Sequence, residues 1–119
     1  MLDAAALARV AGVPFSQVNE LTKRHKMPKD LITKDGKRFT YSPVTVAFFE
    51  ALELLRDVFG DDSPLPLMLA ERATPKLTAL WHSTEPIAAD AIVSIPCAGA
   101  TVTLPATLVT RAKAKLTAS

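Results

Sequence analysis

Glycine and proline residues divide the first third of the chain into short segments, and this limits what it can fold into. Gly12 and Pro14 predict a helix end followed by a helix start. Glycine tolerates the left-handed conformation of a helix stop, and proline fits the first turn of the next helix. Asp3 is a suitable N-cap for the first helix. We therefore expect two short helices joined by a tight turn, the second beginning between Phe15 and Ser16.

A basic β-hairpin is expected after the second helix. Met27-Pro28 ends that helix, because the residue before a proline is pushed out of helical geometry. Residues 31–33 and 38–41 are predicted strands, with Asp35-Gly36 at the centre of the tight turn between them.

Ser42 and Pro43 then supply an N-cap and a first-turn proline for a long helix over residues 44–59. Its apolar surface is wider than packing on two short helices requires. We expect this helix to be covered also by the C-terminal half or by a second chain.

The glycine, acidic residues and proline of positions 60–64 mark the clearest boundary in the sequence. We divide the chain there into an N-terminal domain, residues 1–60, and an accessory segment, residues 61–119. The elements expected in this segment are a short helix from Ser63-Pro64 to Arg72, a restart at Thr74-Pro75, a helix or strand over 76–82, a hairpin of residues 91–95 and 101–104 with a five-residue loop, and a last helix ending at Leu116. The predicted fold class is α+β, mainly α.

Charge is distributed unevenly along the chain. Residues 23–38 contain seven Lys or Arg and two Asp, a local net charge of +5. Residues 44–62 contain one Arg and five acidic residues, a local net charge of −4. We expect one cationic and one anionic surface, of which only the first could attract a polyanion.

Several kinds of site are not expected. The single cysteine, Cys97, cannot form an internal disulfide, which fits a reducing cytoplasm. The N-terminus does not resemble a signal peptide, and no apolar run is long enough to span a membrane, so we expect a cytoplasmic protein. His25 and His82 lie far apart in the sequence without a Cys/His cluster, which argues against a metal site. With no glycine-rich phosphate loop and no acid pair in a catalytic context, we expect neither an enzyme nor a cofactor.

Short segments of the N-terminal half follow one another in a characteristic order. They are ARVAGV at 8–13, SQV at 16–18, KRHKMP at 23–28, the Asp-Gly turn, and RFTYSP at 38–43 before the long helix. Through these segments residues 2–59 resemble the MerR-like group of winged helix-turn-helix DNA-binding domains, which includes MerR transcription regulators and the excisionase-like proteins of mobile elements. The resemblance implies a DNA-binding fold with the hairpin as its wing.

The resemblance does not extend to metal or drug sensing. Asn19, Glu20 and Leu21 stand where MerR regulators usually carry an arginine and paired aromatic residues. No heptad repeat or cysteine-rich ligand spacing follows Asp61. The short basic wing fits the excisionase-like or small phage-regulator end of the group.

The expected DNA-facing residues lie on the second helix and in the basic region after it. A helix fits the major groove of B-DNA, where Gln and Asn can pair with adenine and Arg with guanine. Cations of the hairpin would contact phosphates or enter a minor groove. The candidate DNA-binding residues are Ser16, Gln17, Asn19, Lys23 and Arg24 on the helix, and Lys26, Lys34, Lys37 and Arg38 beyond it. Glu20 would accept from a cytosine amino group or pair with Lys23 or Arg24.

The function expected from these features is sequence-specific binding of double-stranded DNA by a bacterial or phage transcriptional regulator. Residues 61–119 would pair two copies into a homodimer, since symmetry doubles the contacts of a small module, or recruit a protein partner. One alternative is an excisionase-like architectural protein or the DNA-recognition subunit of a phage packaging machine. Another is a protein-interaction module that does not bind DNA and whose basic residues form only a solvated face.

Overall fold

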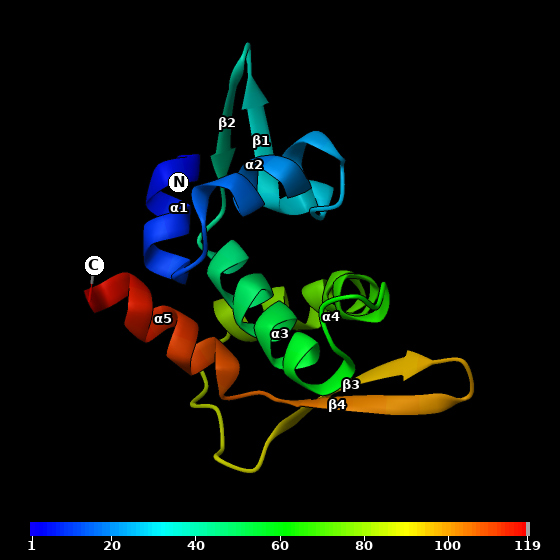
Figure 1. Ribbon diagram of the computed structural model, residues 1–119. Helices are drawn as coiled ribbons and strands as arrows, with labels where there is room; N and C mark the ends of the chain where they lie inside the picture. Colours follow the sequence, from blue (N-terminus) through cyan, green and yellow to red (C-terminus); the bar gives the residue numbers. More distant parts are fainter. Residues whose placement is uncertain (119) are drawn as a thin grey trace.

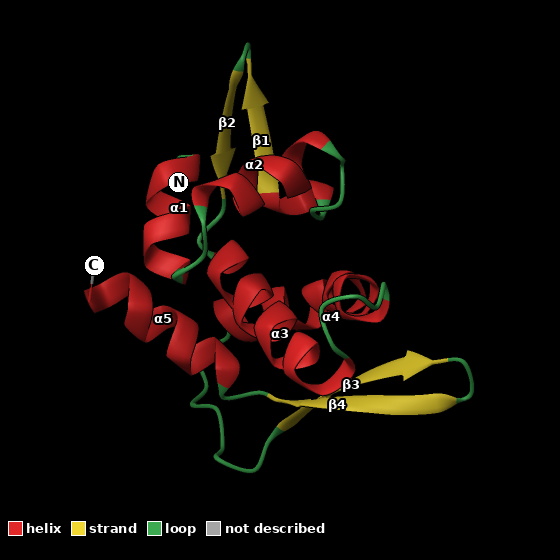
Figure 2. Ribbon diagram, viewed as in Figure 1, coloured by secondary structure: helices red, strands yellow, loops and turns green. Residues whose placement is uncertain are grey.

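A computed structural model describes residues 1–118, which contain five α-helices, one 3₁₀ turn and two separate antiparallel hairpins (Figure 1, Figure 2). The predicted class, α+β and mainly helical, is confirmed. In chain order the elements are α1 (Ala4–Ala11), α2 (Phe15–Lys23), η1 (Lys29–Leu31), β1 (Ile32–Asp35), β2 (Arg38–Tyr41), α3 (Val44–Phe59), α4 (Leu65–His82), β3 (Ile92–Cys97), β4 (Ala100–Pro105) and α5 (Leu108–Ala118).

The ends of α1 and the start of α2 form as their local signals predict. The Asp3 carboxylate accepts a hydrogen bond of 2.7 Å from the Ala6 N–H. Gly12 ends α1 in the left-handed region, with φ 72°, and donates its N–H to the carbonyl of Ala8. Helix α2 begins at Phe15, directly after Pro14.

The wing, formed by β1 and β2, has a turn one residue later than predicted. Asp35 is paired with Arg38, so the two turn residues are Gly36 and Lys37. Gly36 has φ 63° and Lys37 is not in the positive-φ region, as in a type II′ turn, which favours glycine at its first position. Asp35 therefore ends β1 and does not occupy the turn. At the other end of the wing, Leu2 and Tyr41 exchange backbone hydrogen bonds of 2.9 and 2.7 Å, which add the N-terminus to the edge of β2.

Helix α3 is the centre of the molecule. The Ser42 hydroxyl accepts from the Val44 N–H at 3.3 Å, and Pro43, not the predicted Ser42, occupies the N-cap position directly before α3. Every residue from 44 to 52 is buried, and α1, α4 and α5 all pack against α3 (Figure 1). The expectation that the C-terminal half covers this helix is confirmed. Buried residues from both sides of the 60–64 boundary form one hydrophobic cluster.

One buried acid links α3 to α5. The side chain of Glu50 is 9% exposed and forms an ion pair with Lys115, whose side chain is 39% exposed. A buried carboxylate is costly unless it is paired. The pair therefore fixes where α5 lies along α3, while Leu108, Val109 and Ala112 supply the apolar contact.

The prediction of a break at Thr74-Pro75 is wrong, and residues 76–82 are helical. Helix α4 runs without interruption for 18 residues, with Pro75 inside it. The Pro75 nitrogen carries no hydrogen for the Glu71 carbonyl, but the helix is held by packing of its apolar stripe and by nearby threonine hydroxyls. Thr74 Oγ1 donates to the Ala70 carbonyl at 2.9 Å, and Thr78 Oγ1 to the Thr74 carbonyl at 2.8 Å. The buried stripe consists of Pro66, Leu69, Ala70, Ala73, Thr74 and Leu77.

We expect Pro75→Ala to raise the free energy of unfolding by about 1–3 kcal/mol. The Pro75 ring is exposed, so its removal leaves no cavity, and alanine restores the hydrogen bond to the Glu71 carbonyl. Urea denaturation measures the change. The matched control is Pro64→Ala at the exposed start of the same helix, where proline already fits and no gain is expected. A lower stability for Pro75→Ala would contradict this account of α4.

The second hairpin also has a shorter turn than predicted. Cys97 pairs with Ala100, so the loop contains two residues, Ala98 and Gly99, and not five. Both have positive φ, 48° and 83°, as a type I′ turn requires. Pro96 does not end β3, because a proline is tolerated on an edge strand where its nitrogen faces away from the partner strand.

Candidate nucleic-acid interface

Helix α2 and the wing lie together at one end of the molecule. Figure 1 shows the wing projecting away from the helical body, with its base beside α2. The Tyr41 hydroxyl of β2 and the Thr22 hydroxyl of α2 are 2.6 Å apart, and both residues are buried. Thr22 donates its one hydroxyl hydrogen to the Val18 carbonyl at 2.8 Å, so Tyr41 is the donor in the pair. This hydrogen bond fixes the orientation of α2 relative to the wing.

The buried residues of α2 determine which face of the helix is exposed. Val18, Leu21 and Thr22 point into the core. At 100° per residue the opposite face is centred on Ser16, Glu20 and Lys23, and all three are exposed. Asn19 is half-buried and lies one turn before Thr22, on the flank of the helix nearer the wing.

Two predicted base-reading residues lie on the other flank, towards α3. With its amide oxygen turned to Arg56, Gln17 accepts hydrogen bonds from that guanidinium group. Arg24 forms a salt bridge of 3.0 Å with Glu20, one turn earlier. The expected pairing of Glu20 is thus found with Arg24, although a salt bridge this exposed stabilises the helix very little. Gln17 and Arg24 share a surface hollow with Arg56 and are separated from the wing.

Lys26 lies in a region of mixed charge. It lines two hollows between the end of α2 and the α3–α4 connection, together with Arg56 and Asp61, and Glu71 lines one of them. Of the predicted phosphate-contacting residues, Lys26 is therefore the one that the structure does not place with the wing.

The remaining predicted cations project from the wing. Lys34, Lys37 and Arg38 are exposed, and the ammonium group of Lys34 lies 5.6 Å from the centroid of the Phe39 ring. In residues 1–118 ion pairs join only Arg24 to Glu20 and Lys115 to Glu50. The wing cations thus have no carboxylate partner and are available to an external anion.

Two further residues of this surface were not among the predicted sites. Lys29 and His25 are exposed and line a hollow between the end of α2 and the wing, together with Ile32 and Phe39. Lys29 belongs to the basic run of the sequence. Its position beside the wing depends on η1, a turn that the sequence pattern did not predict.

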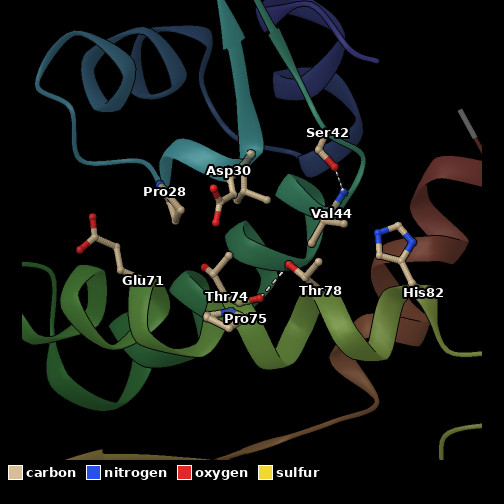
Figure 3. A pocket seen from close by; sticks show the side chains of 10 residues that line it. Pro28, Asp30, Ser42, Val44, Glu71, Thr74, Pro75, Thr78 and His82 are labelled. Atoms are coloured by element: carbon tan, nitrogen blue, oxygen red, sulfur yellow. Dashed lines mark hydrogen bonds between the residues drawn. The ribbon is translucent and has the colours of Figure 1, made fainter.

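A separate hollow lies between η1, the start of α3 and α4 (Figure 3). Asp30 reaches into it from one side, and Glu71 and His82 lie at opposite ends along α4. The Thr74 and Thr78 hydroxyls on its floor donate to carbonyls of their own helix. In the described residues no group of three or more His, Cys, Asp or Glu side chains could hold a metal ion.

Comparisons of the chain with protein-family models, curated proteins and solved structures each found no match. Among residues 1–118 there is no helix with both the length and the apolar character needed to cross a membrane.

The geometry of this end of the molecule suits an extended polyanion better than a small ligand. The exposed face of α2, which carries Ser16, Glu20 and Lys23, lies beside a projecting hairpin whose three cations have no ion-pair partner among residues 1–118. Cations spread along a protruding edge can meet successive phosphates, whereas small-molecule sites are concave and mostly apolar. We use the name cationic end for α2 and the wing together with Lys29.

Proposed function

We propose that the protein binds double-stranded DNA sequence-specifically through its cationic end and acts as a transcriptional regulator. Helix α2 would enter the major groove, and the wing would contact the backbone or the neighbouring minor groove. The observation that carries the proposal is the joint placement of an exposed polar helix face and unpaired wing cations. The buried Tyr41–Thr22 hydrogen bond keeps the two elements in a fixed relation.

The structure supports different roles for the predicted residues. Ser16, Asn19 and Lys23 are on the face or flank of α2 from which base edges could be reached in the groove. Glu20 would face a cytosine amino group, which a carboxylate can accept from. Arg24 can read a base only by leaving Glu20, and Gln17 only by leaving Arg56, so we rank both below Lys23 and Asn19.

The wing residues would supply affinity more than specificity. Lys34, Lys37 and Arg38, with Lys29 beside them, would contact phosphates, which are the same in every sequence. Four phosphate contacts predict that the logarithm of the binding constant falls with the logarithm of salt concentration with a slope of about −3.6.

Selection of binding sites from random DNA duplexes tests the proposal. We expect a defined sequence motif, and fluorescence anisotropy on that duplex should show the steep salt dependence given above. Asn19→Ala should change the preferred base at one position, and Lys37→Ala should weaken binding to all sequences alike. Failure to bind any duplex at low salt, or binding without salt dependence, would refute DNA binding. Several copies bound side by side on one fragment would favour an architectural role.

A further inference from the structure

The β3–β4 hairpin lies at the end of the molecule opposite the wing (Figure 1), and its sequence is uncharged. Residues 91–110 contain no Asp, Glu, Lys or Arg. The inner face of the hairpin is buried through Val93, Ile95 and Leu104. On the outer face Ile92 is 61% exposed, and Thr101, Thr103 and Pro105 are also exposed. Charged side chains usually protect an exposed strand edge from pairing, and the hairpin itself carries none.

One edge of this hairpin is closed by the rest of the chain. Strand β3 packs beside α4, and Arg72 of α4 donates to the Pro96 carbonyl at 3.2 Å. Lys76, one turn later, donates to the Ser94 carbonyl. Pro96 has no N–H to offer. Basic side chains and proline are the usual means of preventing a strand edge from pairing, so the β3 edge is protected.

The other edge, on β4, has no hydrogen-bonded neighbour among residues 1–118. In a hairpin with a two-residue turn the closing pair, here Cys97 and Ala100, exchanges both backbone hydrogen bonds, and the pattern alternates from there. The Ala106 N–H donates to the Ala91 carbonyl at 2.9 Å, which fits the same alternation. Thr101 and Thr103 therefore direct their N–H and C=O groups away from β3. No proline or charged side chain protects the strand between Ala100 and Leu104.

We propose that β4 pairs antiparallel with β4 of a second copy of this chain, so that the two hairpins form one four-stranded sheet. With Val102 at the two-fold axis, Thr101 lies opposite Thr103 of the second copy, and Thr103 opposite its Thr101. Each of these pairs exchanges two backbone hydrogen bonds, which gives four in total. In this register the outward N–H and C=O groups of one β4 edge match those of the same edge in the second copy.

A second copy fits this edge better than a different partner for two reasons. The segment is uncharged, so two copies meet without repulsion, whereas nothing on it would select a charged partner. The hairpin also lies far from the wing, so pairing leaves both cationic ends free (Figure 1). Two six-residue strands bury little surface, and we expect a weak dimer with a dissociation constant on the order of 10–100 μM.

Sedimentation velocity without DNA, over about 5 μM to 1 mM protein, tests the proposal. We expect the wild type to dimerise. Thr103→Pro should raise the dissociation constant at least about tenfold, because proline removes the outward N–H but leaves the hydrogen bonds between β3 and β4 in place. The matched control is Ser94→Pro. Ser94 lies opposite Thr103, and its N–H also points away from the partner strand, but at the protected edge. It should leave dimerisation unchanged.

Two charged variants test the register even if the proline variants fail to fold. A chain with Thr101→Lys and Thr103→Lys, and another with Thr101→Glu and Thr103→Glu, should each be monomeric. Their mixture should form a heterodimer, because each Lys would face a Glu of the other chain. A wild type that stays monomeric at about 1 mM overturns the proposal and leaves the edge to another partner. A dimer that Thr103→Pro does not weaken, or a mixture that does not associate, also overturns it. The assay contains no DNA, so its result is independent of the proposed function.

Discussion

Replacing Lys34, Lys37 and Arg38 together with alanine is expected to lower the affinity for duplex DNA by roughly 100- to 1,000-fold at about 0.1 M salt. Each cation that neutralises a phosphate releases condensed counterions, and this contributes almost a factor of ten at that salt concentration. The three side chains are exposed and have no carboxylate partner among the described residues, so little is lost from the fold. Fluorescence anisotropy on a selected duplex measures the change, and the salt dependence should become less steep by about 2.7.

The control must change the net charge equally without touching the cationic end. Thr110→Glu combined with Arg111→Glu on α5 also lowers the net charge by three, and both positions are exposed. Acidic residues in the first turn of a helix are compatible with its dipole. We expect this variant to bind DNA nearly as the wild type does. An equal loss of affinity in both variants would mean that the protein attracts DNA through its overall charge and not through the wing.

Local signals in the sequence were sufficient for most of the N-terminal half. The Asp3 cap, the Gly12 stop and the hydrogen bond from the Val44 N–H to the Ser42 hydroxyl each depend on backbone groups within four residues, so the sequence nearby determines them. The turns of both hairpins were less predictable. Asp35-Gly36 was expected to be the turn, but strand pairing moved it to Gly36-Lys37, because register depends on contacts along both strands.

The errors in the C-terminal half have a different cause. Pro75 is a reliable local sign of a break, but the packing of α4 on α3 outweighs the one missing hydrogen bond. That packing joins residues far apart in the sequence and cannot be inferred from α4 alone.

The candidate site was predicted only in part, because some of its residues are also placed by contacts between distant parts of the chain. Residue types and charge indicated α2 and the wing. They could not show that Gln17 lies against Arg56, that Lys26 lies near Asp61, or that Lys29 joins the wing. These placements depend on how α2 and η1 sit on the helical body.

Leu69→Ala is expected to lower the free energy of unfolding by roughly 3–4 kcal/mol and to destabilise both halves of the chain together. Leu69 is fully buried in the α4 stripe. Its truncation leaves a cavity in the hydrophobic cluster to which both halves of the chain contribute. The free energy of unfolding of an ordinary domain is about 5–15 kcal/mol, so a loss of this size is a large part of it. Urea denaturation followed by far-UV circular dichroism measures it.

Cooperativity decides whether the boundary at residues 60–64 separates two folding units. Trp81 fluorescence reports on the C-terminal half, and the proposed duplex binding would report on the cationic end. Because α3 begins directly after β2 and is covered by α4 and α5, both signals should be lost at the same urea concentration, shifted equally by Leu69→Ala. Val58→Ala on α3, where the side chain is 75% exposed, should change the stability by less than about 0.5 kcal/mol. If DNA binding survives at urea concentrations that abolish the Trp81 signal, residues 1–60 fold independently and α4 does not support the cationic end.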